Sequence, residues 1–286
     1  MSAKFGPAGN ARSFTEMGYK SSLDVPEYIE KMGLDAFEYQ CGRGVNIGEE
    51  KAALLGAKAA EKGIYLSLHA PYYISMSSLE EAKRDNSVNY ILQSARAVHA
   101  MGGSRIVIHS GSCGKLPREE ALALAVGTMK KALAALDAEG LSNIRPCPET
   151  MGKINQLGDL NEVLALCELD ERILPCIDFG HLNARTHGGL AAYADFEAVL
   201  DQIENRLGAS RLREFHAHFS KIEYTAGGEK CHLTFADQVF GPDYQPLMEL
   251  IAKRNLSPVI ICESAGTQAE DARTMKTAYW KEREAK

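Results

Sequence analysis

Short apolar runs alternate with longer helical patterns from one end of the 286-residue chain to the other. The runs with strand character end near residues 5, 39, 69, 109, 149, 178, 216–219 and 263. The clearest helical patterns cover residues 49–62, 86–101, 117–139, 159–169, 195–207 and 244–253. Parallel strands need helical crossovers between them. The alternation therefore predicts an α/β fold in which helices cover a parallel sheet.

Two architectures fit this alternation, a closed barrel and a doubly wound open sheet. Eight strands and this chain length are typical of a (β/α)₈ TIM barrel, which usually has ~250 residues. No GxGxxG segment follows the first strand and no Walker loop is present, so a nucleotide-binding sheet gains no support. Internal repeats and linkers are also missing from the sequence. We therefore expect one TIM-barrel domain spanning residues 1–286.

Composition limits the class of protein. Hydrophobic residues make up 45% and charged residues 24%, as in ordinary globular proteins. A net charge of −6 disfavours affinity that comes mainly from phosphate neutralisation, although an enzyme with bound divalent cations stays compatible with it. No run approaches the ~18 apolar residues of a membrane span. Seven cysteines without a CxxC pair and an N-terminus without an apolar segment predict a reduced, cytoplasmic protein.

Polar residues that can bind metals recur where the predicted strands end. They are His69, His109, Glu149, Asp178, His216 and Glu263, and His181 follows Asp178 by three positions. In a barrel, the carboxyl ends of all strands meet at one mouth, whereas an open sheet would spread them along an edge. Imidazole and carboxylate groups are ligands of first-row metals. We expect one metal cluster, the alternative being polar groups that cap the mouth by hydrogen bonding with one another.

At these positions the chain resembles endonuclease IV, the second family of apurinic/apyrimidinic endonucleases. The matching segments cover nearly the whole chain and include His69-Ala-Pro-Tyr72, Ile108-His109-Ser-Gly, Glu149-Thr-Met-Gly, Asp178-Phe-Gly-His181 and His216-Ala-His218-Phe-Ser-Lys221. The resemblance implies a TIM barrel with a zinc cluster at the strand ends. It also implies hydrolysis of the DNA phosphodiester on the 5′ side of abasic sites.

The resemblance also implies a role for each ligand. His69 and His109 would bind one zinc with Glu149, which would bridge to a second zinc held by Asp178, His216 and Glu263. Residues His181 and His232 would belong to a third. The predicted catalytic carboxylates are Glu149 and Glu263. We expect two or three zinc ions per chain, with manganese or another divalent ion as an alternative.

The third zinc site departs from the family pattern. The family has an Asp-Arg-His triplet there, whereas this chain has Glu229-Lys-Cys-His232. Glu229 could reach the metal from one residue earlier, Cys231 could act as a thiolate ligand, or the Lys230 ammonium could stand in for a cation. Likewise, His218 replaces part of the family's Asn-Asp pair, and it is either an extra ligand, a substrate contact or a hydrogen-bonded rim residue.

Abasic DNA is the partner that the resemblance implies, and a monomer is the expected state. An enzyme that acts at a lesion must reach it by opening the duplex. The residues expected to contact DNA are Tyr72, Tyr73, Arg43 and Lys221, with Gln40 and Lys153 as further candidates. Tyr72 belongs to the matching motif, and the others follow from their places after predicted strands.

Two other functions fit the same residues. A sugar or sugar-phosphate isomerase or epimerase of the xylose isomerase-like barrels would use Glu149, Asp178, His216 and Glu263 around one or two divalent ions. In such an enzyme the two glutamates would act as acid and base. A barrel that binds damaged DNA or a metal without turnover is the third interpretation. The acidic composition and the altered third site favour the isomerase or epimerase, whereas His69, His109 and His181 favour the nuclease.

Overall fold

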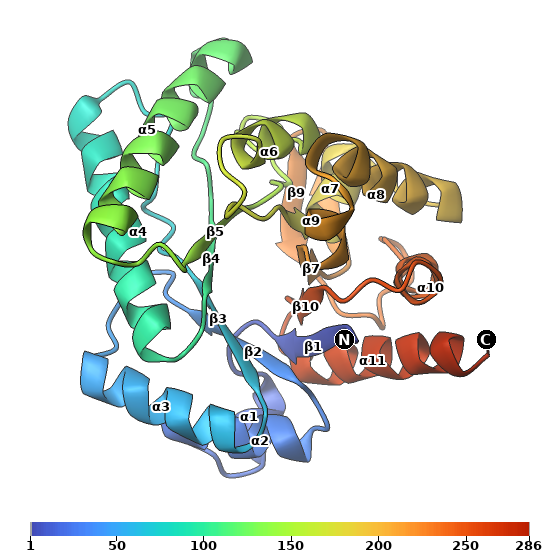
Figure 1. Cartoon of the computed structure of the whole chain (residues 1–286). Coiled ribbons are helices and arrows are strands. Elements are labelled where there is room, and N and C mark those ends of the chain that lie inside the picture. The colour runs from blue at the N-terminus through green and yellow to red at the C-terminus, as the bar shows by residue number, and fades with distance from the viewer. Residues whose placement is uncertain (1, 286) are drawn as a thin grey trace.

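Eight parallel strands form the centre of the computed structural model, which describes residues 2–285 (Figure 1). They are β1 (Lys4–Pro7), β2 (Ala36–Gln40), β3 (Tyr65–His69), β4 (Arg105–Ile108), β5 (Arg145–Pro148), β6 (Cys176–Asp178), β7 (His216–Phe219) and β10 (Val259–Cys262). They pair in the orders β2-β3-β4-β5 and β1-β10-β7-β6. Single parallel bridges, Ala8 to Glu38 and Glu149 to Cys176, join the two sheets into a ring. The predicted TIM barrel is confirmed.

Two prolines explain why β5 and β6 are joined by a single β-bridge and not by a continuous ladder. The amides of Arg145 and Glu149 donate to the β4 side, so the intervening positions 146 and 148 face β6. Both are proline, which has no N–H to donate. The two strands are therefore linked through other amides, including those of Leu174 and Thr150, which donate to Pro146 and Cys176.

Helices surround the ring. They are α1 (Arg12–Glu16), the 3₁₀ helix η1 (Ser22–Asp24), α2 (Val25–Lys31), α3 (Glu49–Glu61), α4 (Glu81–Ala100), α5 (Arg118–Ala138), α6 (Leu160–Cys167), α7 (Phe179–Arg185), α8 (Tyr193–Leu207), α9 (Ala209–Arg213), α10 (Gln245–Lys253) and α11 (Gln268–Glu284). Figure 1 shows α3, α4 and α5 along β2 to β5, and α11 beside β1. No helix of the described residues is long and apolar enough to cross a membrane.

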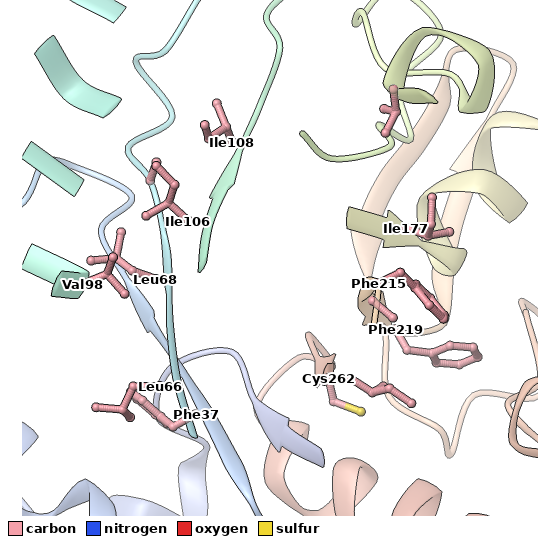
Figure 2. Packing of buried hydrophobic residues seen from close by; sticks show 14 of the residues in the cluster. Phe37, Leu66, Leu68, Val98, Ile106, Ile108, Ile177, Phe215, Phe219 and Cys262 are labelled. Carbon is pink, nitrogen blue, oxygen red and sulfur yellow. The ribbon is translucent and has the colours of Figure 1, made fainter. Parts of the chain in front are cut away.

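Alternation along the strands divides the core in two. Side chains such as Phe37, Leu66, Ile106 and Phe215 face the helices and belong to the large hydrophobic cluster (Figure 2). The residues between them face the barrel interior, where small clusters lie, including one of Val107, Cys147, Leu174 and Cys176. The inward-facing residues nearest the carboxyl ends of the strands lie at the mouth of the barrel.

Three elements differ from the sequence-based expectation. The segment before His216 is partly helical, because α9 covers Ala209–Arg213, and β7 begins at His216. A short helix, α7, follows β6 directly. A two-stranded antiparallel hairpin, β8 (Ile222–Thr225) and β9 (Gly228–His232), is inserted after β7. Both α7 and the hairpin contribute side chains to the mouth.

Candidate metal centre at the barrel mouth

An open cavity of about 690 Å³ lies at the carboxyl ends of the strands. Its lining includes Gln40, His69, Tyr72, His109, Glu149, Lys153, His181, Glu229, His232 and Glu263. Most of the residues predicted from the strand ends therefore meet in one place. Their side chains form three neighbouring groups, each able to hold a metal ion.

The first group consists of His69, His109 and Glu149. Glu149 Oε2 lies 3.3 Å from His69 Nε2 and 3.0 Å from His109 Nε2. The other oxygen of the same carboxylate, Oε1, lies 3.1 Å from His218 Nδ1 and 3.3 Å from His181 Nδ1. The two oxygens of Glu149 thus face different ligand groups, which is the arrangement required of a bridging carboxylate.

The second group consists of Glu149, Asp178, His218 and Glu263. His218 Nδ1 lies 3.5 Å from Glu263 Oε1. Asp178 caps α7 by accepting the His181 amide on Oδ1, while its buried Oδ2 lies 3.3 Å from His181 Nδ1 without forming a hydrogen bond. A buried carboxylate oxygen without a donor is costly. A bound cation would supply the partner that Asp178 lacks.

His218, rather than His216, occupies the position beside Asp178 and Glu263. The two histidines are two residues apart on β7, so both enter the barrel and His216 lies about 6.6 Å deeper. The sequence pattern ends this strand near residues 216–219, as observed, but the family resemblance selects His216 as the ligand, whereas β7 begins at His216 and His218 is the residue that reaches the mouth. His218 therefore replaces His216 in the site that we propose.

Glu38 is a buried carboxylate that sequence reasoning missed. Its Oε2 accepts hydrogen bonds from His216 Nε2 at 3.0 Å and Ser67 Oγ at 2.9 Å, and its Oε1 lies 3.0 Å from His218 Nε2. Burial opposes its ionisation, but the two imidazoles outweigh that effect and hold its pKa well below the usual range. The available signal was a lone Glu inside an apolar strand, at an inward-facing position two residues before Gln40.

The third group consists of His181, Glu229 and His232. Along the hairpin, Glu223 pairs with Cys231 but Tyr224 pairs with Glu229, so Lys230 is the extra residue of a β-bulge. In a regular strand, positions 229 and 232 would face opposite sides. The bulge turns both to the cavity, and Glu229 Oε2 lies 3.4 Å from His181 Nε2.

The geometry of this hairpin favours Glu229 among the alternatives for the third group. Glu229 reaches the site from one residue before the family's ligand position because the bulge absorbs the additional residue. Cys231 Sγ and Lys230 Nζ both contact Glu223 instead, at 3.5 Å and 2.6 Å. Neither of these two side chains lines the cavity.

Three imidazoles are oriented by a partner on the nitrogen that faces away from their group. His69 Nδ1 lies 2.9 Å from the Ala70 carbonyl, and His181 Nδ1 lies 2.9 Å from the Thr150 carbonyl. A carbonyl only accepts, so these Nδ1 atoms carry the proton and leave the Nε2 lone pair for a metal. His232 Nδ1 lies 2.8 Å from Ser220 Oγ, which orients its Nε2 in the same way.

The charge balance of the protein alone also favours cations. Burial, reinforced by Glu263 and Glu149, raises the pKa of Asp178 to about 6. For Glu263, burial acts in the same direction but His218 outweighs it, and the pKa falls to about 2. Burial opposes a charge on His181, yet Asp178 and Glu149 raise its pKa well above the usual value. Without metal, the closely spaced carboxylates are balanced by protons, which are bound either to a carboxylate or to a neighbouring histidine. Divalent ions would replace those protons.

The third group depends on the loop that follows β5. The Glu229 amide donates to the Gly152 carbonyl, and the Ile154 amide donates to Gly227, so the loop and the hairpin are joined by backbone hydrogen bonds. Arg185 donates to the carbonyls of Met151, Lys153 and Ile154 at 2.9–3.1 Å. Arg118 donates to the carbonyls of Ile154 and Gln156. Arg185 and His181 are four residues apart on one helix, which therefore supplies both a candidate ligand and the arginine that holds the loop.

The residues predicted to contact DNA have different placements. Tyr72 is 58% exposed and stacks on His109, with ring centroids 5.4 Å apart. Tyr73 is also exposed and packs against Tyr90 of α4. Arg43 is exposed on the loop after β2 but does not line the cavity. Lys221 is buried, and its Nζ donates to the Asp237 carbonyl at 2.6 Å. Lys221 therefore holds a loop in place and does not line the cavity.

Comparisons with known proteins identify relatives of this chain. An uncharacterised protein of Methanocaldococcus jannaschii is 33% identical over 272 residues, which is 95% of either chain. A probable endonuclease 4 of Mycoplasma pneumoniae is 26% identical over 200 residues, covering 68% of this chain and 65% of the relative. Relatives of this name confirm the resemblance to endonuclease IV.

Solved structures with under 25% identity show the fold. Endonuclease IV from Thermus thermophilus superposes with a TM-score of 0.69 at 18% identity, covering 99% of this chain and 100% of the other. A D-tagatose 3-epimerase-like protein gives a TM-score of 0.74 at 17% identity, covering 99% and 98%. A family model described as xylose isomerase-like TIM barrel matches residues 26–282. The chain belongs to the xylose isomerase-like TIM barrel family.

Proposed function

We propose that the protein is a metal-dependent DNA repair endonuclease that hydrolyses the phosphodiester on the 5′ side of abasic sites. The observation that carries this proposal is the meeting of three ligand groups at one cavity, with Glu149 shared by two of them. A single divalent ion would need one such group. The additional histidines 69, 109, 181 and 232 fit a cluster of two or three zinc ions better than a one-metal site.

In this reaction a water oxygen bonds to phosphorus, the bond to the 3′ oxygen breaks, and the leaving oxygen takes up a proton. Zinc, or manganese in its place, would polarise the phosphate and lower the pKa of the attacking water. Glu149 and Glu263 have depressed pKa values despite burial, because histidines surround them, so both are ionised acceptors. Their oxygens would orient the water through its hydrogens, which is a positioning contribution.

The rim of the cavity carries groups suited to a DNA strand opened at a lesion. Tyr72 presents an exposed aromatic face beside His109, and sugars and bases stack on such faces. Lys153 is exposed on the cavity lining, where its ammonium can reach a phosphate. Tyr73 and Arg43, exposed on the loops after β3 and β2, would extend this surface. The net charge of −6 makes these local groups and the bound cations the source of affinity.

The test is cleavage of a duplex that contains one abasic site, with zinc-loaded protein and with chelator-treated protein. We expect one nick that leaves a 3′ hydroxyl, and its loss on chelation. His109→Ala should lower the rate by at least about 100-fold because a ligand is removed. His99→Ala is the matched control, since His99 is exposed on α4. No nicking by protein with a full metal complement would overturn the proposal.

A divalent-metal sugar isomerase or epimerase is the second candidate, favoured by one observation. Glu149, Asp178, His218 and Glu263 form a single group with two glutamates, which would suit proton transfer between adjacent carbons. Incubation with ketohexoses in D₂O separates the two functions. Deuterium incorporation with one bound metal ion supports the epimerase. Lesion binding with neither reaction supports a barrel that binds damaged DNA without turnover.

A further inference from the structure

A second cluster of metal-binding side chains lies one layer below the mouth. Cys176 and His216 are partners in the register of β6 and β7, and His218 follows on the same face of β7. All three are fully buried, and their ligand atoms lie within 4.8 Å of one another. We propose that Cys176, His216 and His218 form a further metal site in the barrel interior, selective for a thiophilic ion such as Zn²⁺.

Unsatisfied nitrogens point to an ion at this place. His216 Nε2 is held by Glu38, but its Nδ1 is buried without a hydrogen-bond partner. His218 Nε2 is likewise buried, and its 3.0 Å contact with Glu38 Oε1 lacks the alignment of a hydrogen bond. Buried nitrogens are nearly always satisfied in proteins. One cation bound by both rings would satisfy the two atoms together.

His218 can serve two layers because its ring nitrogens face different groups. Nδ1 lies 3.1 Å from Glu149 in the mouth, and Nε2 faces Glu38 in the layer below. Binding an ion at each nitrogen requires the ring to lose its N–H proton. Binding also releases the Cys176 thiol proton, so two protons leave as the interior ion enters.

The charges also balance in the interior. The Cys176 thiolate and the Glu38 carboxylate together offset a divalent ion, while the negative charge of the deprotonated His218 ring is shared with the ion at the mouth. Glu38 is fully buried within reach of both histidines. Sulfur distinguishes this site from the mouth, whose three groups contain only histidine and carboxylate ligands. A thiolate with imidazoles selects zinc and its analogue cobalt over magnesium or calcium.

The test uses Co²⁺, because a thiolate ligand gives a charge-transfer band in the near ultraviolet that nitrogen and oxygen ligands do not give. We expect this band in the cobalt-loaded protein. The Cys176→Ser variant should lose the band and should bind one metal ion per chain fewer than wild type. The Cys231→Ser variant should keep the band. Cys231 is the matched control because it is a free thiol near the third mouth group. A missing band in the wild type, or one that survives Cys176→Ser, would overturn the site.

A second measurement does not depend on the folding of Cys176→Ser. Zinc-edge X-ray absorption on the zinc-loaded Cys231→Ser protein should show a sulfur neighbour at about 2.3 Å. Only nitrogen and oxygen neighbours in that spectrum would contradict the proposal. The mouth groups contain no sulfur ligand, so the two tests are independent. A failure of DNA nicking would contradict the proposed nuclease function, whereas a missing sulfur signal would contradict the interior site.

Discussion

The amide of Glu229 donates to the carbonyl of Gly152, and the contact leaves no room for a side chain at position 152. A Cβ there would lie 2.6 Å from Glu229 Cβ and 2.9 Å from His181 Cδ2. Gly228 makes the reciprocal approach, since its Cβ would lie 2.2 Å from the Gly152 carbonyl oxygen. The absence of a side chain at Gly152 therefore sets the spacing between two ligands of the third group.

We expect Gly152→Ala to empty the third group while the groups around Glu149 keep their metal. Elemental analysis after dialysis should give one ion per chain fewer than wild type. Gly227→Ala is the control in the same hairpin, because its Cβ would meet nothing closer than Thr225 Oγ1 at 3.8 Å. An unchanged metal content in Gly152→Ala would show that the hairpin can move aside without losing the ion.

Metal removal should destabilise the whole barrel. Asp178 Oδ2 lies 3.3 Å from His181 Nδ1 but has no hydrogen-bond partner, and the carboxylates of Glu149, Asp178 and Glu263 lie in one group. An ion at about 100 times its dissociation constant stabilises the folded state by about 2.7 kcal/mol. Chelation should therefore lower Tm by roughly 4–5 °C for each ion lost, as measured by differential scanning calorimetry. Added zinc should restore it, and an unaltered Tm would argue against metal binding at the mouth.

The barrel could be predicted because strand and helix periods alternate along the whole chain. The candidate ligands His69, His109, Glu149 and Asp178 could be predicted because each directly follows or ends an apolar run. His218 could not be separated from His216 by pattern alone. Both positions have the same parity, and only the start of β7 decides which one reaches the mouth.

Features that depend on contacts between distant segments could not be predicted from the sequence. The bulge at Lys230 depends on how β9 pairs with β8, and a single strand does not reveal a shift in register. The two arginines that hold the loop after β5 come from α5 and α7, more than sixty positions apart in the sequence. Glu38 meets His216 and His218 across the barrel interior, which only closure of the ring brings about.

The pair of Arg118 and Glu162 should make stability depend on pH. Glu162 accepts from Arg118 Nη2 at 2.6 Å and from the amides of Gly158 and Asp159. Burial opposes its ionisation, but these donors outweigh burial and lower its pKa. A depressed carboxylate pKa contributes stability above the ordinary value near 4.5, and the contribution is lost as pH falls through the lower value.

Glu162→Gln should therefore cost about 1–2 kcal/mol in urea unfolding at pH 7. The difference from wild type should shrink as the pH falls below about 4. Glu139→Gln is the matched control, because Glu139 also forms a bidentate salt bridge with an arginine, Arg96, but does so at the surface. We expect a smaller loss there. A Glu162→Gln difference that stays constant with pH would mean that its charge is unimportant.

Tyr72 should contribute to DNA affinity through its position over Gly42. Its ring is stacked on His109, and a Cβ on Gly42 would lie 2.6 Å from its Cε2 atom. Stacking of a base on an aromatic side chain is worth about 1–3 kcal/mol. Tyr72→Ala should therefore weaken binding of abasic duplex by roughly 5- to 150-fold, and Gly42→Ala should reproduce part of the loss by displacing the ring. Tyr72→Phe should retain affinity because the aromatic face remains.

Fluorescence anisotropy at fixed salt measures the dissociation constants of these variants for abasic duplex, with Trp280→Ala on α11 as the exposed aromatic control. Equal affinity of Tyr72→Ala and Trp280→Ala would remove Tyr72 from the DNA surface.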